Sequence, residues 1–391
     1  MKRHKTNLLI FAHEASLTGA PIFLLNLLRS FQSSNEYEFF FIFKNTGPLI
    51  NDFNKLGHVY HADYLNNTQS KSIRFLIRFL PIYKIRKIIL KIRIYFFNPS
   101  LFISNTIVNS KTLSIVNKKN RKLITIVHEM KDVISLFDRL KINNSSDVIG
   151  KSDKIIAVSR AVEKDLILHN NVQKNKIKVI TNTISYFEKI KASDEDILQW
   201  KKRNNISNKV FLVGTCGAPI WRKGPDIFLY TVKTFIRTYP KEKVCFIWQG
   251  GDPKSAAFLN FESEVLRLDL GDYVRIIPAS KKIHFFYNAI DLLISTAREE
   301  PFGLTILEAG FYKVPCIAFE KSGGPEEILS ENKGIIIPYG NFQNSANEIY
   351  SLKNNKKKRN FFSKELNKYS LESSMENNFL KYKKIVDLYS R

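Results

Sequence analysis

The sequence predicts an α/β protein with two doubly wound domains, each built on a parallel sheet. Short runs of Val, Ile, Leu and Phe alternate with longer amphipathic segments along the whole chain. Buried parallel strands are near-continuous apolar runs, and strands that alternate with helices form βαβ units. The 391 residues suffice for two ordinary domains. Two such series of strands therefore predict two Rossmann-like domains.

The expected strands follow in chain order, and the polar stretch 184–208 separates them into two series. The first series comprises residues 8–12, 39–43, 101–104, 123–127 and 155–158. The second comprises residues 210–214, 244–248, 274–277, 292–295, 316–319 and 335–337. We expect an N-terminal domain over 1–190, a C-terminal domain over 205–370, and a last amphipathic helix within 371–391 that packs back on the N-terminal domain.

Composition narrows the class of protein. The formal net charge of +25 favours an anionic partner, such as nucleic acid, an acidic membrane surface or a phosphorylated ligand. The three cysteines lack metal-ligand spacing and each lies in an apolar run, so they are expected to be buried thiols. His13 and Glu14 interrupt the first apolar stretch, so a signal peptide is not expected. A cytoplasmic protein is the expectation.

The segment 295–310 carries the pattern of a ligand site. It follows an expected strand, and Pro301 suits a helix start because proline needs no N–H partner there. Free backbone N–H groups and the helix dipole would then bind phosphate at Phe302, Gly303 and Leu304. Glu300 lies at the loop tip, and Glu308 lies a little over two helical turns further on. One carboxylate can hold sugar hydroxyls and the other a ribose; the alternative is an acidic helix start with a surface glutamate.

The span from Glu300 to Glu308 matches the E-x7-E motif in its E-P-F-G-L-x-x-x-E form, and the chain thereby resembles glycosyltransferase family 4, the group 1 enzymes of polysaccharide and O-antigen synthesis. The resemblance implies the GT-B fold, with two Rossmann-like domains facing a central cleft. It implies an acceptor-binding N-terminal domain, a nucleotide-sugar-binding C-terminal domain and retention of anomeric configuration. By the same resemblance Glu300 contacts the donor sugar and Glu308 the ribose.

A second loop, residues 217–224, follows another expected strand. It resembles the family loop G-R-x-x-x-x-K-G, which places cations on the donor diphosphate, and Lys223 matches the family lysine. Ala218 stands at the family arginine position, so Arg222 is the candidate replacement from the other end of the loop. Fixed cations are needed because the departing diphosphate gains negative charge as the glycosidic bond breaks. The alternative is an Arg-Lys turn without a function.

Two features of the N-terminal domain are candidates for the same site. Gly19 lies in a small-residue loop after the first strand, similar to the family loop near the donor phosphate and acceptor, although a simple strand–helix turn is the alternative. His128 ends the strand 123–127, at the edge where ligands bind in open α/β sheets. It resembles the family histidine close to the donor sugar, where a ring nitrogen or the backbone carbonyl would act; the alternative is a structural histidine.

No metal or cofactor is expected. Asp194 and Asp196 form a D-x-D pattern, but Ser193 followed three residues later by an acid is typical of a helix N-cap. Neither His13-Glu14 nor His128-Glu129 continues as H-E-x-x-H, so zinc hydrolase chemistry is not indicated. The resemblance likewise implies a metal-independent enzyme whose nucleotide sugar is a substrate.

Residues 71–93 form a basic stretch without acids, interleaved with apolar residues. Its cations are Lys71, Arg74, Arg78, Lys84, Arg86, Lys87, Lys91 and Arg93. Pro81 is expected to divide it into two helices. The interpretation is a helix pair on anionic lipid headgroups at the inner face of the cell membrane. The alternative is a core helix with a solvated basic face.

The leading hypothesis is a retaining transfer of a sugar from an NDP-sugar to a glycan or lipid-linked acceptor in cell-surface polysaccharide synthesis. A nucleotide-sugar epimerase of the same fold is the alternative enzyme, and it would act without an acceptor. A nucleic-acid-binding protein would explain the charge, but the sequence lacks a zinc-finger, RNP-like or KH-like motif. No nucleic acid is therefore expected as a partner.

Overall fold

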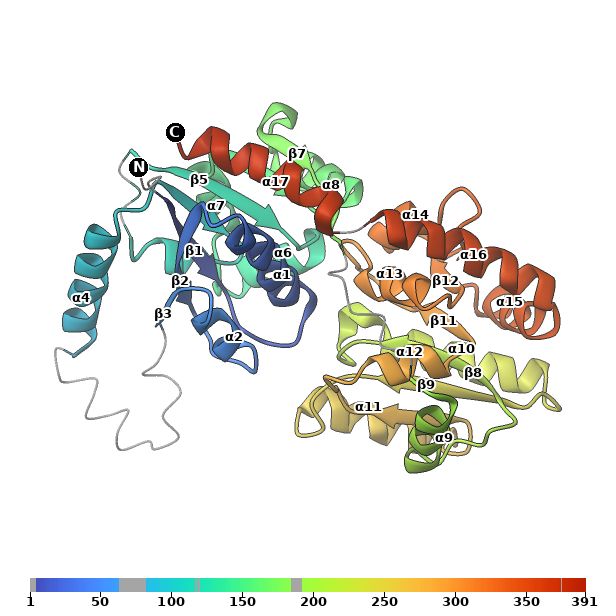
Figure 1. Ribbon diagram of the computed structural model, residues 1–391. Coiled ribbons are helices and arrows are strands. Elements are labelled where there is room, and N and C mark those ends of the chain that lie inside the picture. The colour runs from blue at the N-terminus through green and yellow to red at the C-terminus, as the bar shows by residue number, and fades with distance from the viewer. Residues whose placement is uncertain (1–4, 63–81, 117, 119, 184–191, 374) are drawn as a thin grey trace. The chain divides into compact units, whose positions relative to one another are not determined.

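The chain folds into two compact units, described here by a computed structural model (Figure 1). The structure describes residues 5–62, 82–116, 118, 120–183, 192–373 and 375–391. One unit comprises Met1–Ser185 together with Met375–Arg391, and the other comprises Tyr186–Ser374. The chain thus leaves the first unit, completes the second, and returns to the first with its last helix.

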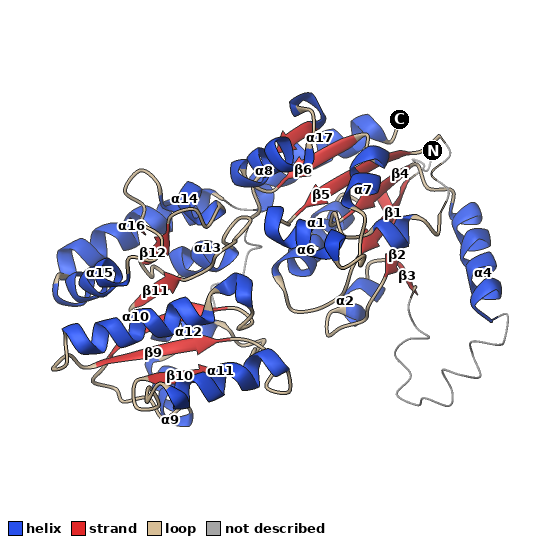
Figure 2. Cartoon of the chain, turned by 180° about the vertical axis from the view of Figure 1, so that it is seen from behind, coloured by secondary structure: helices blue, strands red, loops and turns tan. Residues whose placement is uncertain are grey.

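The first unit is built on a parallel sheet of seven strands among its described residues, in the order β3-β2-β1-β4-β5-β6-β7. The strands are β1 (Thr6–Ala12), β2 (Tyr37–Phe43), β3 (His58–His61), β4 (Leu101–Ser104), β5 (Lys122–Val127), β6 (Lys154–Ala157) and β7 (Ile177–Val179). The central β1 pairs with both β2 and β4, and its residues Leu8 to Phe11 are fully buried. Helices cover the two faces of this sheet (Figure 2).

The helices of the first unit follow the strand–helix alternation that the sequence predicts. They are α1 (Gly19–Ser33), α2 (Ile50–Asn54), α4 (Ile82–Phe97), α5 (Ser110–Leu113), α6 (Lys131–Arg139), α7 (Ser145–Lys151), α8 (Arg160–Asn170) and α17 (Met375–Tyr389). The last helix packs on α1, where Phe379 contacts Phe31 and Tyr382 contacts Phe23 edge-on or tilted, at ring-centroid distances of 5.0 and 5.7 Å. Lys383 links the same helix to Glu36 through an ion pair and forms a second ion pair with Asp387 within the helix.

The second unit repeats the plan with a parallel sheet in the order β10-β9-β8-β11-β12-β13. Its strands are β8 (Phe211–Cys216), β9 (Val244–Gln249), β10 (Val274–Ile277), β11 (Leu292–Ser295), β12 (Cys316–Phe319) and β13 (Ile335–Ile337). Its helices are α9 (Asp194–Arg203), α10 (Pro225–Thr238), α11 (Ala256–Arg267), α12 (His284–Ala289), α13 (Leu304–Phe311), α14 (Gly324–Leu329), α15 (Phe342–Asn354) and α16 (Lys356–Glu372). One core of Phe228, Phe246, Trp248 and surrounding aliphatic side chains fills the space between sheet and helices.

These two sheets confirm the predicted fold class. In the second sheet the strand order reverses between β8 and β11, which pair side by side. Ligands of doubly wound sheets bind beyond the carboxyl ends of the strands at such a switch point. The two loops that the sequence marks out, 217–224 and 296–303, leave the carboxyl ends of these two neighbouring strands.

Candidate functional site

Backbone and side-chain hydrogen bonds join the two loops at the switch point of the second sheet. The N–H of Arg298 donates to the carbonyl of Arg222 at 2.8 Å, and the Thr296 hydroxyl donates to the carbonyl of Lys223 at 3.0 Å. In return, Arg222 Nη1 donates to the carbonyl of Glu299 at 2.9 Å. The two loops therefore form one platform, and the side chains that they carry are fixed relative to each other.

Arg298 adds a further clamp on this platform. Its guanidinium binds both carboxylate oxygens of Asp226, at 2.8 and 2.5 Å, and donates to the carbonyl of Trp221 at 2.9 Å. The guanidinium also lies 5.2 Å from the centre of the Trp221 ring. A planar guanidinium makes such paired bonds where a lysine cannot. The motif analysis did not single out Arg298 or Asp226.

Glu300 is the acidic centre of the platform. Lys223 forms a short ion pair with its carboxylate, and Arg222 Nη1 lies 3.6 Å from the same oxygen. Burial by itself raises the pKa of Glu300, but the two cations and the Gly303 N–H outweigh burial and hold the pKa below its ordinary value. Glu300 is therefore ionised at neutral pH, and Lys223 and Arg222 are held where an anionic ligand would meet them.

The helix after Glu300 starts later than the sequence predicts. Pro301 does not open it: α13 begins at Leu304, after Gly303 with φ 102°. Glu300 is instead held in an isolated bridge with Gly323, where its N–H donates to the Ser322 carbonyl at 2.7 Å. That bridge keeps the chain extended through Pro301. The Ile306 N–H makes the first bond of the helix, to the Gly303 carbonyl at 2.9 Å, so the N–H groups of Leu304 and Thr305 are the ones that precede it.

Glu308 lies on α13, and its carboxylate accepts a 2.5 Å hydrogen bond from the hydroxyl of Tyr287 on α12. Burial raises the pKa of Glu308 to about 7, against the opposing effects of the Tyr287 hydroxyl and of Lys223. The Tyr287 ring is buried and stacks on Tyr312 with an interplanar angle of 8°. Tyr287 was not predicted as a site residue, although a buried tyrosine needs a partner for its hydroxyl.

Gly217 leaves room for the side chain of Lys223. It has φ 143°, and a Cβ there would lie 3.1 Å from Cε of Lys223. The ring N–H of Trp248 donates to the Gly217 carbonyl at 2.8 Å and fixes this turn. Ala218, where the family arginine is expected, is followed by Pro219 and Ile220, and Arg222 is the second cation that the structure brings to Glu300.

In the first unit, His128 follows β5 and its ring contacts two asparagines. Its Nε2 lies 3.1 Å from Oδ1 of Asn105, and its Nδ1 lies 3.4 Å from Nδ2 of Asn182. The carboxylate of the neighbouring Glu129 accepts from the Thr106 hydroxyl and from the N–H groups of Ile107 and His128.

Gly19, predicted to lie in the small-residue loop, is instead the first residue of α1, so the helix begins earlier than expected and the loop ends before Gly19. In that loop the Ser16 hydroxyl donates to Glu14 at 2.6 Å. The Ala20 carbonyl in the first turn of α1 accepts from Nδ2 of Asn105 at 3.0 Å. The start of α1 is thereby linked to the surroundings of His128 within the first unit.

The D-x-D pattern is a helix start, as predicted. Ser193 caps α9 and accepts from the N–H of Asp196 at 3.1 Å, and the Asp196 carboxylate accepts from the Ser193 N–H in a capping box. Within the described ranges, no cluster of three or more His, Cys, Asp or Glu side chains is arranged to hold a metal ion.

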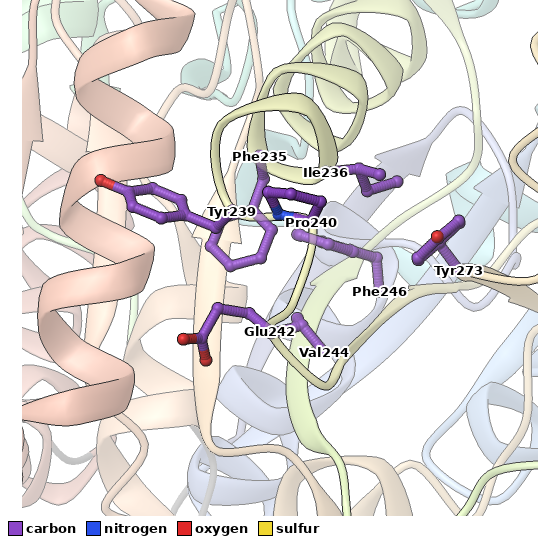
Figure 3. A pocket seen from close by; sticks show the side chains of 8 residues that line it. All are labelled: Phe235, Ile236, Tyr239, Pro240, Glu242, Val244, Phe246 and Tyr273. Atoms are coloured by element: carbon purple, nitrogen blue, oxygen red, sulfur yellow. The ribbon is translucent and has the colours of Figure 1, made fainter.

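A shallow hollow in the second unit lies at the opposite edge of its sheet (Figure 3). It is lined by Phe235, Ile236, Tyr239, Pro240, Glu242, Val244, Phe246 and Tyr273. Val244 begins β9, whereas the loops of the platform leave the carboxyl ends of the strands. Lys353 pairs with the Glu242 carboxylate at the border of the hollow, which is therefore a packing feature separate from the platform.

The fold and the platform define an α/β protein of two units in which Lys223, Arg222 and two glutamates lie near the switch point of the second sheet. Residues 196–369, which lie within the second unit, match the family model for glycosyl transferases group 1, in agreement with the E-x7-E resemblance. The chain is 26% identical over 243 residues to the capsular polysaccharide biosynthesis glycosyltransferase CapM of Staphylococcus aureus, covering 58% of this chain and 62% of CapM.

Two further similarities point in the same direction. The lipopolysaccharide core biosynthesis mannosyltransferase LpsB of Rhizobium meliloti is 27% identical over 144 residues, which are 36% of this chain and 41% of LpsB. The chain thus spans less than two thirds of the length of these relatives. Anabaena HepE, solved with UDP-glucose, superposes with a TM-score of 0.79 over 97% of this chain and 99% of HepE, at 18% identity. The fold is therefore the GT-B fold.

Proposed function

We propose that this chain is a retaining, metal-independent glycosyltransferase that moves a sugar from a nucleoside-diphosphate sugar to a glycan or lipid-linked acceptor in cell-surface polysaccharide synthesis. The observation that carries the proposal is the pairing of Lys223 and Arg222 with Glu300 beside the start of α13, with Glu308 on the same helix. The names of CapM and LpsB, which act in capsule and lipopolysaccharide synthesis, support the pathway.

The roles follow from charge and position. Lys223 and Arg222 bind the diphosphate and stabilise the charge that it gains as the glycosidic bond breaks, helped by the N–H groups that begin α13. Arg222 thereby replaces the arginine absent at position 218. Glu300 accepts hydrogen bonds from hydroxyls of the donor sugar, and Glu308 accepts them from the ribose. Bound diphosphate shares Lys223 with Glu300, so the ion pair keeps the cation in place before the ligand arrives.

The test combines binding with product analysis. Thermal shift against a panel of NDP-sugars identifies the donor, and NMR of the product with acceptor present reports the anomeric configuration. Lys223→Met should lower the transfer rate by about 100-fold, since a lost transition-state donor costs about 3 kcal/mol. Lys353→Met is the matched control, because Lys353 also forms a partly buried ion pair in the second unit, with Glu242. Interconversion of the donor without acceptor would instead identify an epimerase.

We also propose that α4 binds an anionic membrane surface at the inner face of the cell membrane. The part of the basic stretch before residue 82 lies outside the described residues. In α4 the apolar side chains of Ile85, Ile88, Ile89, Ile92, Tyr95 and Phe96 are exposed, and Leu90 and Ile94 are buried. The exposed Lys91 and Arg93 lie among them. The helix stands at the outer side of its unit, apart from the helices that cover the sheet (Figures 1 and 2).

This exposure favours membrane contact over a solvated core helix. Isoleucines that insert at the interface add apolar burial to the attraction of cations for anionic headgroups, which is about 1 kcal/mol per basic residue. None of the helices in the described ranges is long and apolar enough to cross a membrane. Flotation with phosphatidylserine vesicles tests the proposal: Ile88→Ser with Ile92→Ser should abolish binding. The control is Leu259→Ser with Leu266→Ser, which removes exposed leucines from α11.

A further inference from the structure

The ring of His128 is held by a chain of hydrogen bonds that runs through three segments of the first unit. The Ala20 carbonyl at the start of α1 accepts from Nδ2 of Asn105, at 3.0 Å. Oδ1 of Asn105, just after β4, lies 3.1 Å from Nε2 of His128. Nδ1 of His128 lies 3.4 Å from Nδ2 of Asn182, which follows β7. Both ring nitrogens therefore already have a partner.

The carbonyl at one end determines the orientation of Asn105 and the proton on Nε2 of His128. A backbone carbonyl can only accept, so Asn105 must turn its NH₂ group toward Ala20 and its oxygen toward the ring. The opposite amide orientation would set two acceptor oxygens 3.0 Å apart. Because Oδ1 of Asn105 only accepts, Nε2 of His128 must carry the proton. In the neutral ring Nδ1 then holds a lone pair, which accepts from Nδ2 of Asn182.

The surroundings of the ring favour its neutral form. Phe23 packs edge-on against the imidazole at 5.3 Å, and the ring of Tyr382 in α17 lies 5.7 Å from that of Phe23. The nearest acid in sequence, Glu129, is occupied by Thr106 and by backbone N–H groups. Burial lowers the pKa of His128 to about 3, so the ring is uncharged at neutral pH.

We propose that Asn105 and Asn182 are positioning residues that fix His128 as a neutral imidazole protonated on Nε2, and that this histidine does not act as a general acid or base. Removing a proton from Nε2 or adding one to Nδ1 would break a bond to one of the two asparagines. Any contribution of His128 to the reaction then comes from the fixed position of its backbone and ring. This consequence for catalysis rests on the proposed glycosyl transfer, whereas the tautomer is a property of the free protein.

The first test needs no substrate. Long-range ¹H–¹⁵N spectra of the uniformly labelled full chain report which ring nitrogen of each histidine is protonated, and His128→Gln assigns the signal of His128 by its loss. We expect the Nε2–H tautomer, with no titration between pH 5 and 8. An Nδ1–H tautomer, or a titration midpoint within that range, would overturn the proposal.

The second test replaces the hydrogen-bond donor beside Nδ1 of His128 with an acceptor. Asn182→Asp places an acceptor-only group beside Nδ1, so a proton must enter there, and a neighbouring carboxylate raises a histidine pKa by about 1–3 pH units. We expect the midpoint of His128 to rise by that amount. Asn51→Asp, which adds the same charge at an exposed position of α2, should leave it unchanged. A midpoint unaltered by Asn182→Asp in the folded protein contradicts the assignment.

The third test measures the rate of sugar transfer. With donor and acceptor, Asn182→Asp should lower kcat by about 10- to 100-fold, as expected when a positioned group shifts, with little change in the KM of the donor. The same kcat in both variants would show that the asparagine does not position His128 for the reaction. Failure of the unmodified chain to transfer sugar would refute the proposed function, and the spectra would still decide the tautomer.

Discussion

The ionisation of Glu308 should control donor binding near neutral pH. Burial raises its pKa from 4.5 to about 7, whereas the pKa of Glu300 is lowered and that carboxylate stays ionised. The Tyr287 hydroxyl has a pKa raised well above its ordinary value, so it stays a hydrogen-bond donor. Among the platform groups with a shifted pKa, Glu308 is therefore the one expected to change charge between pH 6 and 8.

The magnitude follows from that pKa. With a midpoint at about 7, the ionised fraction of Glu308 falls about tenfold from pH 8 to pH 6, which corresponds to about 1.4 kcal/mol. Ribose hydroxyls bond more strongly to a carboxylate than to a carboxylic acid, because charge-assisted hydrogen bonds are roughly twice as strong. The affinity for the NDP-sugar should therefore fall by up to about tenfold over this range, with a slope no steeper than one proton.

Tyr287→Phe should raise the pH at which Glu308 ionises and the donor binds. The phenol favours the ionised carboxylate, so its loss raises the pKa of Glu308 further and shifts the half-point of binding to higher pH. The variant should bind weakly at pH 7 and regain affinity toward pH 9. Tyr312→Phe is the matched control, because Tyr312 stacks on Tyr287 while the 2.5 Å bond to Glu308 comes from Tyr287.

Isothermal titration calorimetry with the NDP-sugar measures these affinities. Both phosphates of an NDP-sugar are diesters without the second ionisation near pH 6 of a terminal phosphate, so the observed proton belongs to the protein. A dissociation constant that stays flat from pH 6 to 8.5 would refute the reasoning, as would a Tyr287→Phe curve that coincides with that of Tyr312→Phe.

Three further perturbations test the surrounding structure. Glu308→Gln should stabilise the free protein at pH 8 by about 1–2 kcal/mol. The rise in the pKa of Glu308 from 4.5 to about 7 corresponds to about 3 kcal/mol, and the expected gain is smaller because the side chain is partly exposed to solvent. Since the burial cost of the charge vanishes below pH 4.5, the gain in melting temperature should disappear there. Arg298→Lys keeps the charge but loses the paired bonds to Asp226, and calorimetry should show a several-fold weaker donor affinity. Lys383→Met removes the ion pairs to Glu36 and Asp387 and should speed hydrogen exchange in α17, with a loss of stability of about 1 kcal/mol.

Most strands were predictable because a buried parallel strand is apolar on both faces. Residues 101–104, 274–277, 292–295, 316–319 and 335–337 are strands with the bounds expected from their runs of apolar residues. β3 (His58–His61) was missed, since an edge strand with half-exposed side chains has no such run. β7 (Ile177–Val179) was missed because it is three residues long and contains a lysine. Runs of apolar residues therefore locate both edge strands of the second sheet but neither edge strand of the first.

The site was predictable where its residues are near one another in sequence. Glu300, Gly303 and Glu308 lie on one loop and helix, and Lys223 lies in a loop after the neighbouring strand, so local spacing and the rule for strand ends suffice to bring them together. The error at Pro301 has a long-range cause. The bridge from Glu300 to Gly323 keeps the chain extended past a residue that would otherwise start a helix.

The residues that tune the candidate groups were beyond prediction for the same reason. Tyr287 reaches Glu308 across 21 residues, and Asn182 reaches His128 across 54. Neither contact has a spacing that marks it, because each depends on which strands become neighbours in a sheet. Yet these contacts matter for protonation: the phenol opposes the rise that burial causes in the pKa of Glu308, and on our proposal the asparagines fix the tautomer of His128. Sequence motifs thus locate candidate acids and bases, whereas their protonation depends on partners that only the fold assembles.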